Sequence, residues 1–308
     1  MRVCVYAIAC NEGENIEAWL AAVGEADVVY VTDTGSTDNT PALLRAGGAI
    51  VSQFTEPFRF DAARNYALEQ AKKSGADIYV SLDLDEIPEA GWRSKLEQAP
   101  DANGWRIEID NGDSSFKNIR AHRDEGWTWR HACHEVLCGA GPIRDAGFKV
   151  VHHQDLSKPR SYLPLLELDA EENPTDGRAW HYLGREYMYL SQWDKAIDAL
   201  TEALSFDMWQ EQRSMSCVYI SRCMWRTGDY RGAREYAWRA VREYGSREAW
   251  VHLTWLLNWE NDPTACIAAE NALKINRHGT YPSEAGAWNS DDWLIKTARG
   301  GQAVCGNT

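Results

Sequence analysis

The sequence lacks an excess of basic residues, a long apolar run and any Cys-x-x-Cys motif. Its 308 residues carry 32 Lys and Arg against 46 Asp and Glu, which gives a net charge of −14 at pH 7. This balance argues against broad electrostatic binding to nucleic acid or to an anionic membrane. Because no run of about 18 uncharged apolar residues occurs, we expect no transmembrane helix.

The eight cysteines are scattered through both halves of the chain. Without a Cys-x-x-Cys motif, they are best interpreted as small buried hydrophobic side chains of a protein in a reducing compartment. The N-terminal residues enter a strand-like apolar run directly, and they lack the basic segment and the long apolar segment of a secretory signal. We therefore expect the protein to be cytoplasmic.

The overall composition is that of an ordinary globular protein. Hydrophobic residues make up 44% of the chain and charged residues 25%, which excludes disorder over the whole length. A length of 308 residues suits one large domain or two ordinary ones. The 15 Trp are unusually many. Most fall in the C-terminal half at helical spacing, where core packing explains them better than a ligand site.

The N-terminal half alternates apolar runs with helical patterns. Strands are predicted at 3–9, 27–32, 49–54 and 78–82, and helices at 15–23, from Pro41 to Gly47 and at 61–73. This alternation predicts an α/β domain with a mostly parallel sheet and right-handed crossovers. Polar residues directly follow the first, second and fourth strands, at the edge where open α/β sheets bind ligands.

The C-terminal half is wholly helical in pattern. A W-x2-L-G-x2-Y motif begins at Trp180, and a similar turn between helices recurs at Trp193, Tyr230 and Pro263. The first two turns lie 37 residues apart and the last two 33. Such spacing is typical of the tetratricopeptide repeat, whose period is about 34 residues. About three units of this kind bury a continuous core, and about three are visible.

Two carboxylates, Asp83 and Asp85, follow the fourth predicted strand one residue apart. Hard oxygen ligands of this kind suit Mg²⁺ or Mn²⁺ carrying a diphosphate. Taken alone, a D-x-D motif is explained equally well by a solvated acidic loop. Phosphatases of the haloacid dehalogenase type also carry D-x-D after a strand, but normally after the first one. Here the first strand ends in Cys10-Asn11-Glu12, which disfavours that alternative.

Two further polar segments follow a strand or begin a helix. Turn and helix-cap chemistry explains most of the segment 33–40, but it does not explain Asp33, which would lie at the ligand edge. Arg64 falls near the start of the helix predicted at 61–73. An arginine beside a helix N-terminus can clamp a diphosphate, although a surface ion pair would explain it as well.

Together these segments resemble glycosyltransferase family 2, which has the GT-A fold. The matching segments are 10–16, 33–38, 60–65 and 82–86. The resemblance covers roughly residues 1–155, and with the repeats it predicts a GT-A domain over 1–158 and a tetratricopeptide-like helical domain over 159–308. This combination is similar to the branch that includes bacterial peptide and cell-surface glycosyltransferases. It implies a nucleotide-sugar donor, with a UDP-sugar expected, and Mn²⁺ or Mg²⁺ as cofactor.

The resemblance also implies a role for each matched residue. Asp85 would bind the metal, and Asp83 the metal or the ribose. Asp33 would contact the nucleobase or the ribose, and Arg64 the nucleotide. The residues predicted to bind the nucleotide-sugar are Asn11, Glu12, Asp33, Arg64, Asp83 and Trp129.

Three tryptophans, Trp105, Trp127 and Trp129, are candidates for stacking on the sugar or the acceptor. Burial against the sheet explains at least one of them better. We select Trp129 as the candidate for the donor site.

The segment His131-Ala132-Cys133-His134-Glu135 suggests zinc at first sight. It does not form H-E-x-x-H, because Cys138 stands where the second histidine would be. In the resembling family a His-Glu pair at about this place faces the acceptor. An inverting transfer needs a carboxylate to take the acceptor's proton. Glu135 is therefore the predicted general base.

A late histidine of the family often reaches the metal. This chain has His152 and His153, and we favour His153 as the ligand together with Asp85. A histidine that packs on the sheet and bonds a backbone carbonyl is an equally good explanation for either. The familiar family tail reads His-His-Gly, whereas Gln154 follows here, which leaves the exact ligand open.

The predicted activity is transfer of a sugar to a hydroxyl or thiol acceptor with inversion. The acceptor is left open among a peptide or protein, a glycan and a modified nucleobase. The helical repeats are expected to hold it or to form a homodimer. Two alternatives stand beside this prediction. One is a nucleotidyltransferase that makes sugar nucleotides, which the acidic Glu12 and Glu14 after the first strand disfavour. The other is a catalytically inert repeat scaffold.

Overall fold

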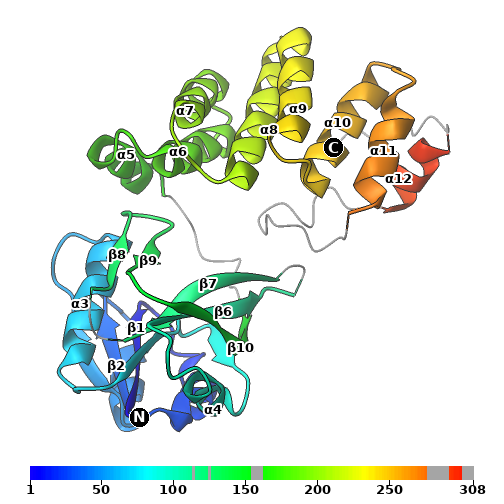
Figure 1. Ribbon diagram of the computed structural model, residues 1–308. Helices are drawn as coiled ribbons and strands as arrows, with labels where there is room; N and C mark the ends of the chain where they lie inside the picture. The colour runs from blue at the N-terminus through cyan, green and yellow to red at the C-terminus, as the bar shows by residue number, and fades with distance from the viewer. Residues whose placement is uncertain (113–114, 124–125, 154–161, 276–290, 300–308) are drawn as a thin grey trace. The chain divides into compact units, whose positions relative to one another are not determined.

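The computed structural model describes residues 1–308 apart from 113–114, 124–125, 154–161, 276–290 and 300–308. The chain divides into two units, 1–160 and 161–308 (Figure 1). The first unit contains all the described strands, and the second is helical. The predicted fold class, an α/β domain of GT-A type followed by an all-α repeat domain, is confirmed.

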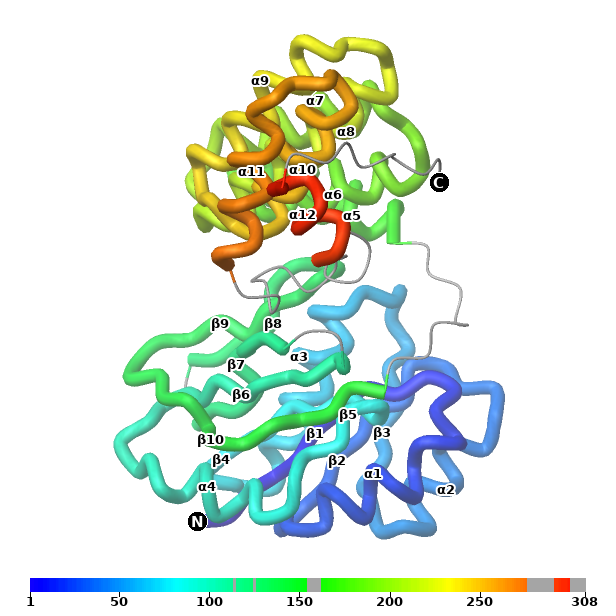
Figure 2. The backbone as a smooth tube through the Cα atoms, turned by 90° about the vertical axis from the view of Figure 1, so that its right-hand side faces the viewer, coloured from blue at the N-terminus to red at the C-terminus, as the bar shows by residue number. Residues whose placement is uncertain are grey.

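Within the described residues, eight strands form one mixed sheet in the order β3-β2-β1-β4-β7-β6-β10-β5, and its neighbouring members β7, β6 and β10 lie side by side in Figure 2. The strands are β1 (Val3–Ala9), β2 (Val28–Asp33), β3 (Ile50–Gln53), β4 (Ile78–Ser81), β5 (Glu86–Pro88), β6 (Gly104–Asp110), β7 (Ser115–His122) and β10 (Ile143–His152). The first four are parallel, as predicted from their apolar runs. Two further strands, β8 (Thr128–Arg130) and β9 (Val136–Cys138), form a separate hairpin.

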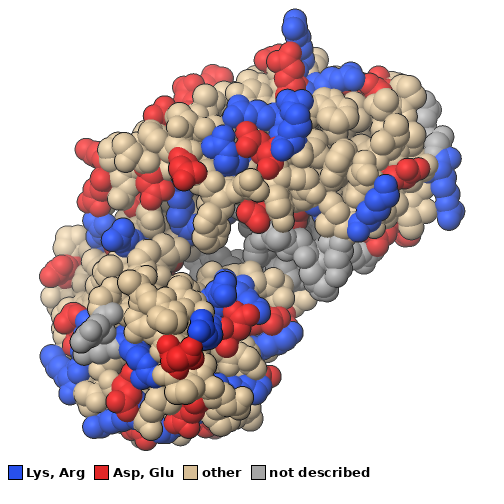
Figure 3. All heavy atoms as spheres, viewed as in Figure 1, with Lys and Arg blue, Asp and Glu red and all other residues tan. Residues whose placement is uncertain are grey.

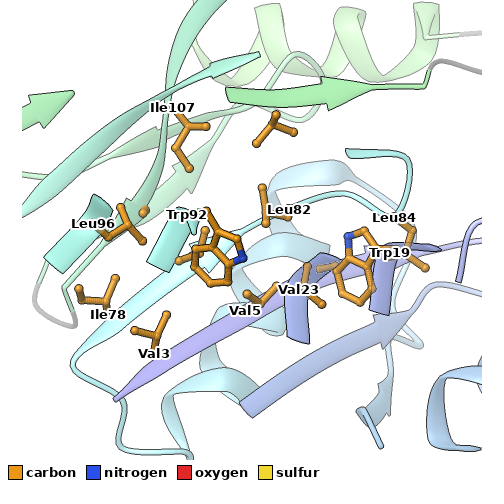
Figure 4. Packing of buried hydrophobic residues seen from close by; sticks show 14 of the residues in the cluster. Val3, Val5, Trp19, Val23, Ile78, Leu82, Leu84, Trp92, Leu96 and Ile107 are labelled. Carbon is orange, nitrogen blue, oxygen red and sulfur yellow. The ribbon is translucent and has the colours of Figure 1, made fainter. Parts of the chain in front are cut away.

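Helices cover both faces of the parallel part of the sheet. The helices are α1 (Ile16–Ala22), the short 3-10 helix η1 (Val23–Glu25), α2 (Thr40–Ala46), α3 (Phe60–Lys72) and α4 (Trp92–Glu97). Alternate residues of β1 point to opposite faces. Val3 and Val5 pack in a core with Trp19 of α1 and Trp92 of α4 (Figure 4). Cys4 and Tyr6 pack with α3 on the other face.

The large aromatic side chains of the main core are completely buried. Trp19 and Trp92 have no exposed surface and lie among Val5, Val23 and Leu82 (Figure 4). Truncating a buried tryptophan to alanine typically costs about 3–5 kcal/mol of folding free energy, because the cavity it leaves only partly collapses. All five N-terminal tryptophans therefore belong to this core or to a neighbouring apolar cluster.

After β4 the sheet changes from parallel to antiparallel. β7 pairs antiparallel with β4 and with β6, and β10 then pairs parallel with β6. The short strand β5 adds to the outer side of β10, with His152 opposite Glu86. This pairing brings the end of the N-terminal unit back to the loop that follows β4. The sequence analysis predicted none of these later strands.

The second unit is built from antiparallel helix pairs. Its described helices are α5 (Leu163–Glu172), α6 (Gly177–Tyr189), α7 (Trp193–Ser205), α8 (Gln210–Thr227), α9 (Tyr230–Glu243), α10 (Arg247–Trp259), α11 (Ala265–Leu273) and α12 (Asp291–Ala298). The three predicted turns separate α6 from α7, α8 from α9 and α10 from α11. Gly184 lets α6 approach α7 closely, because a Cβ there would lie 2.5 Å from the Leu200 side chain. The repeat prediction is confirmed.

Charges of both signs are mixed over the visible surface, and most of the described cysteines are buried. Figure 3 shows Lys and Arg side chains interspersed with Asp and Glu over the visible face of each unit. No described helix has the length and apolar character needed to cross a membrane. The described cysteines are free thiols, and Cys4, Cys133, Cys217 and Cys223 are buried, as expected for small hydrophobic side chains. Cys10 is exposed.

Acidification is expected to destabilise the first unit through His122. This side chain is completely buried, and burial lowers its pKa to about 4. In the unfolded chain the pKa is about 6.5, so between these values the unfolded state binds more protons and stability falls with falling pH. The full effect is about 3 kcal/mol. Hydrogen exchange of the β1 and β4 amides at pH 7 and pH 4.5 measures it.

The matched variant is His122→Gln, which removes the titrating group. Its stability is expected to change less between pH 7 and pH 4.5 than that of the wild type, whatever its stability at pH 7. Equal pH dependence in the two proteins would show that His122 does not carry the effect.

Candidate active site

The predicted site residues gather at one edge of the parallel sheet. β1 lies between β2 and β4, and all three run in the same direction. Their carboxyl ends therefore meet, and the loops that begin at Cys10, Thr34 and Leu82 lie side by side. This is the edge at which open α/β sheets bind ligands. The prediction that these loops converge is correct.

The first two loops are tied to each other through Asn11. Its side-chain oxygen accepts hydrogen bonds from the backbone N–H groups of Thr37 (2.8 Å) and Asp38 (3.3 Å). Its own backbone N–H donates to Ser36 Oγ at 2.9 Å. Asn11 adopts a left-handed backbone conformation with φ 56°. It therefore shapes the loop, and its amide oxygen is already engaged.

Glu12 and Asp33 also serve the local structure. The backbone N–H of Glu12 donates to Thr40 Oγ1 at 2.8 Å, and its carboxylate accepts a hydrogen bond from Asn15. Asp33, only 4% exposed, accepts weak hydrogen bonds from the N–H groups of Gly35 and Ser36. Turn chemistry thus explains Asp33 as well, although it ends β2 at the expected edge.

Arg64 bridges two carboxylates that are far apart in the sequence. Its terminal nitrogens donate to Asp83 Oδ1 and Oδ2 at 2.7 and 2.9 Å, and its Nε donates to Glu135 Oε1. The residue is 5% exposed. Burial alone would lower the pKa of Arg64, but the charges of Asp83 and Glu135 outweigh it and raise the pKa. Arg64 is thus a buried link between the two acids.

Asp83 remains ionised despite its position. Burial by itself would raise the pKa of Asp83, but the nearby Arg64 and Arg120 outweigh burial and hold the pKa below its usual range. A bidentate arginine–carboxylate pair is also rigid, because two parallel hydrogen bonds fix both planes. Asp83 therefore presents a fixed negative charge just after β4.

The Trp129 ring packs against the Arg64 guanidinium that links Asp83 and Glu135. The Arg64 guanidinium lies over its ring, 4.9 Å from the centroid, and the side chain is 4% exposed. The ring face covered by Arg64 is not open to a sugar. Trp127 and Trp105 are buried as well. The burial of the Trp129 ring therefore argues against the predicted stacking of a sugar on it.

The sequence analysis missed two residues of the site, Arg120 and Glu86. Arg120, on β7, donates to Glu86 Oε1 at 2.8 Å and lies 3.7 Å from Asp83 Oδ2. The other oxygen of Glu86 accepts the backbone N–H of Asp83 at 2.9 Å. Burial raises the pKa of Glu86 to about 7. Glu86 directly follows the D-x-D motif in the sequence, which could have identified it, whereas no motif in the sequence marks Arg120.

Asp85 is paired with His152. The His152 Nε2 and Asp85 Oδ2 atoms are 3.2 Å apart, and His152 Nδ1 lies 3.0 Å from Asn111 Oδ1. The hydrogen bond to Asp85 is the main cause of a raised pKa for His152. His153 contacts Asp85 only through its backbone N–H, which donates to the Asp85 carbonyl at 2.8 Å. His152, and not the predicted His153, thus pairs with the Asp85 side chain, while the metal ligand itself stays a prediction. Gln154 lies outside the described residues.

Asp85 and His152 fit a divalent cation that is completed by other ligands. Within the described part of the chain, no group of three or more His, Cys, Asp or Glu side chains is placed to hold a metal. The carboxylate oxygen of Asp85 is a ligand that Mn²⁺ and Mg²⁺ prefer, whereas the imidazole nitrogen of His152 is a less typical ligand for these ions. Mg²⁺ is commonly held by one or two carboxylates plus phosphate oxygens and water. The donor set therefore fits a cation that binds together with a diphosphate.

The loop before Glu135 holds its backbone in unusual conformations. His131 and His134 have φ values of 77° and 53°, in the left-handed region that non-glycine residues seldom adopt. The loop connects β8 to β9, and Glu135 immediately precedes β9. Strained backbone of this kind concentrates at functional sites, where the surrounding structure holds it in place. Here it directs the Glu135 side chain towards Arg64.

Two family models match the chain. Residues 4–153 match the glycosyl transferase family 2 model, and residues 177–208 match the tetratricopeptide repeat model. No curated protein sequence matches the chain significantly. The N-terminal unit is thus a glycosyltransferase family 2 domain, fused to tetratricopeptide-like repeats.

Several solved structures are similar to parts of the chain. Glucosyl-3-phosphoglycerate synthase from Mycobacterium tuberculosis, crystallised with Mn²⁺, UDP and glucosyl-3-phosphoglycerate, is 23% identical over 35% of this chain and 44% of its own, with a TM-score of 0.31. MamA is 16% identical over 37% of this chain and 66% of its own, with a TM-score of 0.33. A mycobacterial protein is 21% identical over 35% and 41%, with a TM-score of 0.31. The matches span less than two thirds of each of these structures.

Proposed function

We propose that this protein, through its glycosyltransferase family 2 domain, is a metal-dependent enzyme that transfers a sugar from a UDP-sugar to a hydroxyl or thiol acceptor with inversion. One observation carries the proposal. Asp83 and Glu135, 52 residues apart in the chain, bind the same Arg64 guanidinium at the sheet edge. Asp85, with His152 beside it, follows directly. The carboxylate that we propose as a metal ligand and the proposed base therefore lie on loops that are linked through Arg64 and Asp83.

Glu135 is suited to take the acceptor's proton. Arg64 engages its Oε1 atom, and within the described residues its Oε2 atom accepts no hydrogen bond. The acceptor oxygen or sulfur would donate its proton to Oε2 while it attacks C1 of the sugar. The bond between C1 and the diphosphate oxygen breaks on the opposite face, so the configuration at C1 inverts. A positioned general base typically contributes about 10²–10⁴-fold to such a step.

The remaining residues would bind and orient the donor. Asp85 and His152 are the proposed metal ligands, and the cation supplies Lewis-acid neutralisation of the departing diphosphate. Asp33 and the loop at Asn11 would line the nucleoside side of the same edge. Arg64 keeps Asp83 and Glu135 at a fixed separation. Such positioning matters because a small misalignment of the reacting groups costs a large part of the rate.

Binding of UDP with Mn²⁺ should raise the melting temperature of the protein. A ligand that binds only the folded state stabilises it by mass action, by about 2.7 kcal/mol at 100 times the dissociation constant. For a domain of this size that corresponds to roughly 5–10 °C. A thermal-shift screen of UDP, UDP-sugars and other nucleotide-sugars, each with and without Mn²⁺, tests this.

The expected pattern is a large shift only when nucleotide and Mn²⁺ are present together. Asp85→Ala is the matched variant and should lose the metal-dependent part of the shift. If no nucleotide shifts the wild type in any condition, the inert-scaffold alternative gains support. Release of pyrophosphate from UTP and a sugar phosphate would instead favour a nucleotidyltransferase. The helical repeats stay the proposed place for the acceptor or for a homodimer contact.

A further inference from the structure

We propose that Arg120 is a positioning residue for the transfer reaction, which acts by fixing the turn that carries Asp85. The inference rests on the proposed function and adds a residue that neither the sequence motifs nor the family match singled out. Arg120 lies on β7, which pairs with β4 through Val80 and Ala121. It therefore reaches the turn after β4 from the adjacent strand.

The turn from Asp83 to Glu86 is closed by its own residues. The backbone N–H of Glu86 donates to the Asp83 carbonyl at 2.9 Å. The Glu86 side chain returns to accept the Asp83 N–H through Oε2, also at 2.9 Å. Asp85 lies within this turn, so the position of the Glu86 carboxylate determines how Asp85 is presented.

Arg120 fixes that carboxylate. Its Nη2 donates to Glu86 Oε1 at 2.8 Å, and the Glu86 side chain is 3% exposed. Its Nη1 lies 3.7 Å from Asp83 Oδ2, so one guanidinium faces both acids of the turn. Without Arg120, the buried Glu86 carboxyl would lose its cationic partner and become neutral more readily. It would then no longer be held in place by an ion pair.

The Trp129 ring contacts both Arg120 and Arg64. Both guanidiniums lie over the Trp129 ring, at 5.9 and 4.9 Å from its centroid. The indole N–H donates to the Tyr6 hydroxyl at 3.0 Å, which anchors the ring to β1. Arg64 therefore positions Glu135 and Asp83, while Arg120 positions Asp83 and the Asp85 turn. Contact with the same ring restrains the Arg64 and Arg120 guanidiniums relative to each other.

Lysine cannot replace Arg120 in this arrangement. The two contacts come from different nitrogens of a planar group, and the plane also lies against an aromatic ring. A lysine ammonium is a single point charge and reproduces only one of these contacts. Arg120→Lys is therefore an informative variant, because it keeps the charge and removes the geometry.

The test compares Arg120→Lys and Arg120→Met with the wild type. We expect the Mn²⁺ concentration for half-maximal transfer to rise about 10–100-fold, as is typical when a residue that orients a metal ligand is changed. Calorimetry of UDP binding with Mn²⁺ should show a matching loss of affinity, which gives a readout independent of turnover. The KM for the acceptor should change little, because Glu135 keeps its own contact with Arg64.

Two matched variants separate positioning from stability. Arg123→Met removes another arginine near the end of β7, which bonds the Ala102 carbonyl and lies over Trp105. It should lower the melting temperature without changing the Mn²⁺ dependence. Glu86→Gln should resemble Arg120→Met, and the double variant should be little worse than either, because residues acting as a unit are not additive.

The outcomes distinguish this inference from the proposed function. If wild-type protein binds no UDP and transfers no sugar, the proposed function fails, and this inference fails with it. If the wild type is active and Arg120→Lys and Arg120→Met keep its Mn²⁺ dependence and UDP affinity per folded molecule, the positioning role alone is wrong. Unchanged Mn²⁺ dependence in Glu86→Gln would contradict it independently.

Discussion

Replacing Asp85 by alanine is expected to lower sugar transfer by more than about 10³-fold while the protein stays folded. The side chain is partly exposed and pairs with His152 at the edge of the site. The exposed part of its carboxylate is accessible to a cation, and in the proposed function the variant lacks the carboxylate ligand. Without that ligand, the charge that develops on the departing diphosphate is not neutralised. Transfer and donor hydrolysis, each measured with saturating Mn²⁺, report the loss.

The control for this experiment is Asp101→Ala. Asp101 forms an exposed ion pair with Arg144, and exposed pairs contribute little to stability. This variant should keep full activity. Circular dichroism and melting temperature confirm that both variants are folded. An Asp85→Ala protein with wild-type transfer would end the metal role of Asp85.

Replacing Glu135 by glutamine is expected to lower transfer by about 10³-fold and to leave binding of UDP with Mn²⁺ intact. Glutamine has almost the shape of glutamate, and its carbonyl oxygen can still accept the hydrogen bond from Arg64 Nε. The amide cannot accept a proton from the acceptor. The effect should therefore appear in kcat for transfer, whereas calorimetry of UDP with Mn²⁺ should give the wild-type affinity.

Glu108→Gln provides the comparison. Glu108 lies on β6 and pairs with Lys149 at the surface, so its neutralisation should leave transfer unchanged. If Glu135→Gln keeps the wild-type kcat, another group takes the proton. If Glu135→Gln loses UDP affinity together with kcat, Glu135 acts on donor binding and the proposed assignment is wrong.

The parts of the fold that the sequence predicts are those with strong local patterns. The run from Val3 to Ala9 is apolar throughout, because a central parallel strand is covered on both faces. The turns near Trp193 and Tyr230 recur at a repeat spacing, because each repeat buries the same face. Strands β6, β7 and β10 lie in the mixed part of the sheet beyond β4, where side chains alternate and local signals are weaker.

The choice between His152 and His153 shows why site details escape sequence analysis. Neighbouring residues of a strand point to opposite faces, so register alone decides which histidine meets Asp85. The pairing of β10 with β6 shifts register between Asp145 and Lys149. Gly147, with a φ of 75°, marks this irregularity in the sequence, but a glycine alone does not define the register of the residues that follow. The preferred His153 therefore had no physical basis that could separate it from His152.

Arg64 illustrates the same limit in another way. The sequence indicates an arginine near the start of a helix, and the structure places Arg64 in contact with two other predicted site residues, Asp83 and Glu135. Whether its guanidinium meets a ligand or two carboxylates depends on how loops 71 residues apart approach each other, as Arg64 and Glu135 do. That approach is set by the hairpin β8–β9, for which the sequence gives no turn or repeat signal.

Asn65, on α3, joins that hairpin to the helix by hydrogen bonds to Thr128 and to the backbone of Trp129. Its side-chain oxygen accepts the backbone N–H of Trp129 at 2.8 Å, and its side-chain nitrogen donates to the Trp129 carbonyl at 2.9 Å. The amide thus imitates the edge of a neighbouring strand. These bonds couple the hairpin to α3. If the protein opens to admit the acceptor, we expect the two elements, and with them Glu135 and Arg64, to move together. The hydrogen bond between Arg64 and Glu135 would then persist while the acceptor binds and the product leaves.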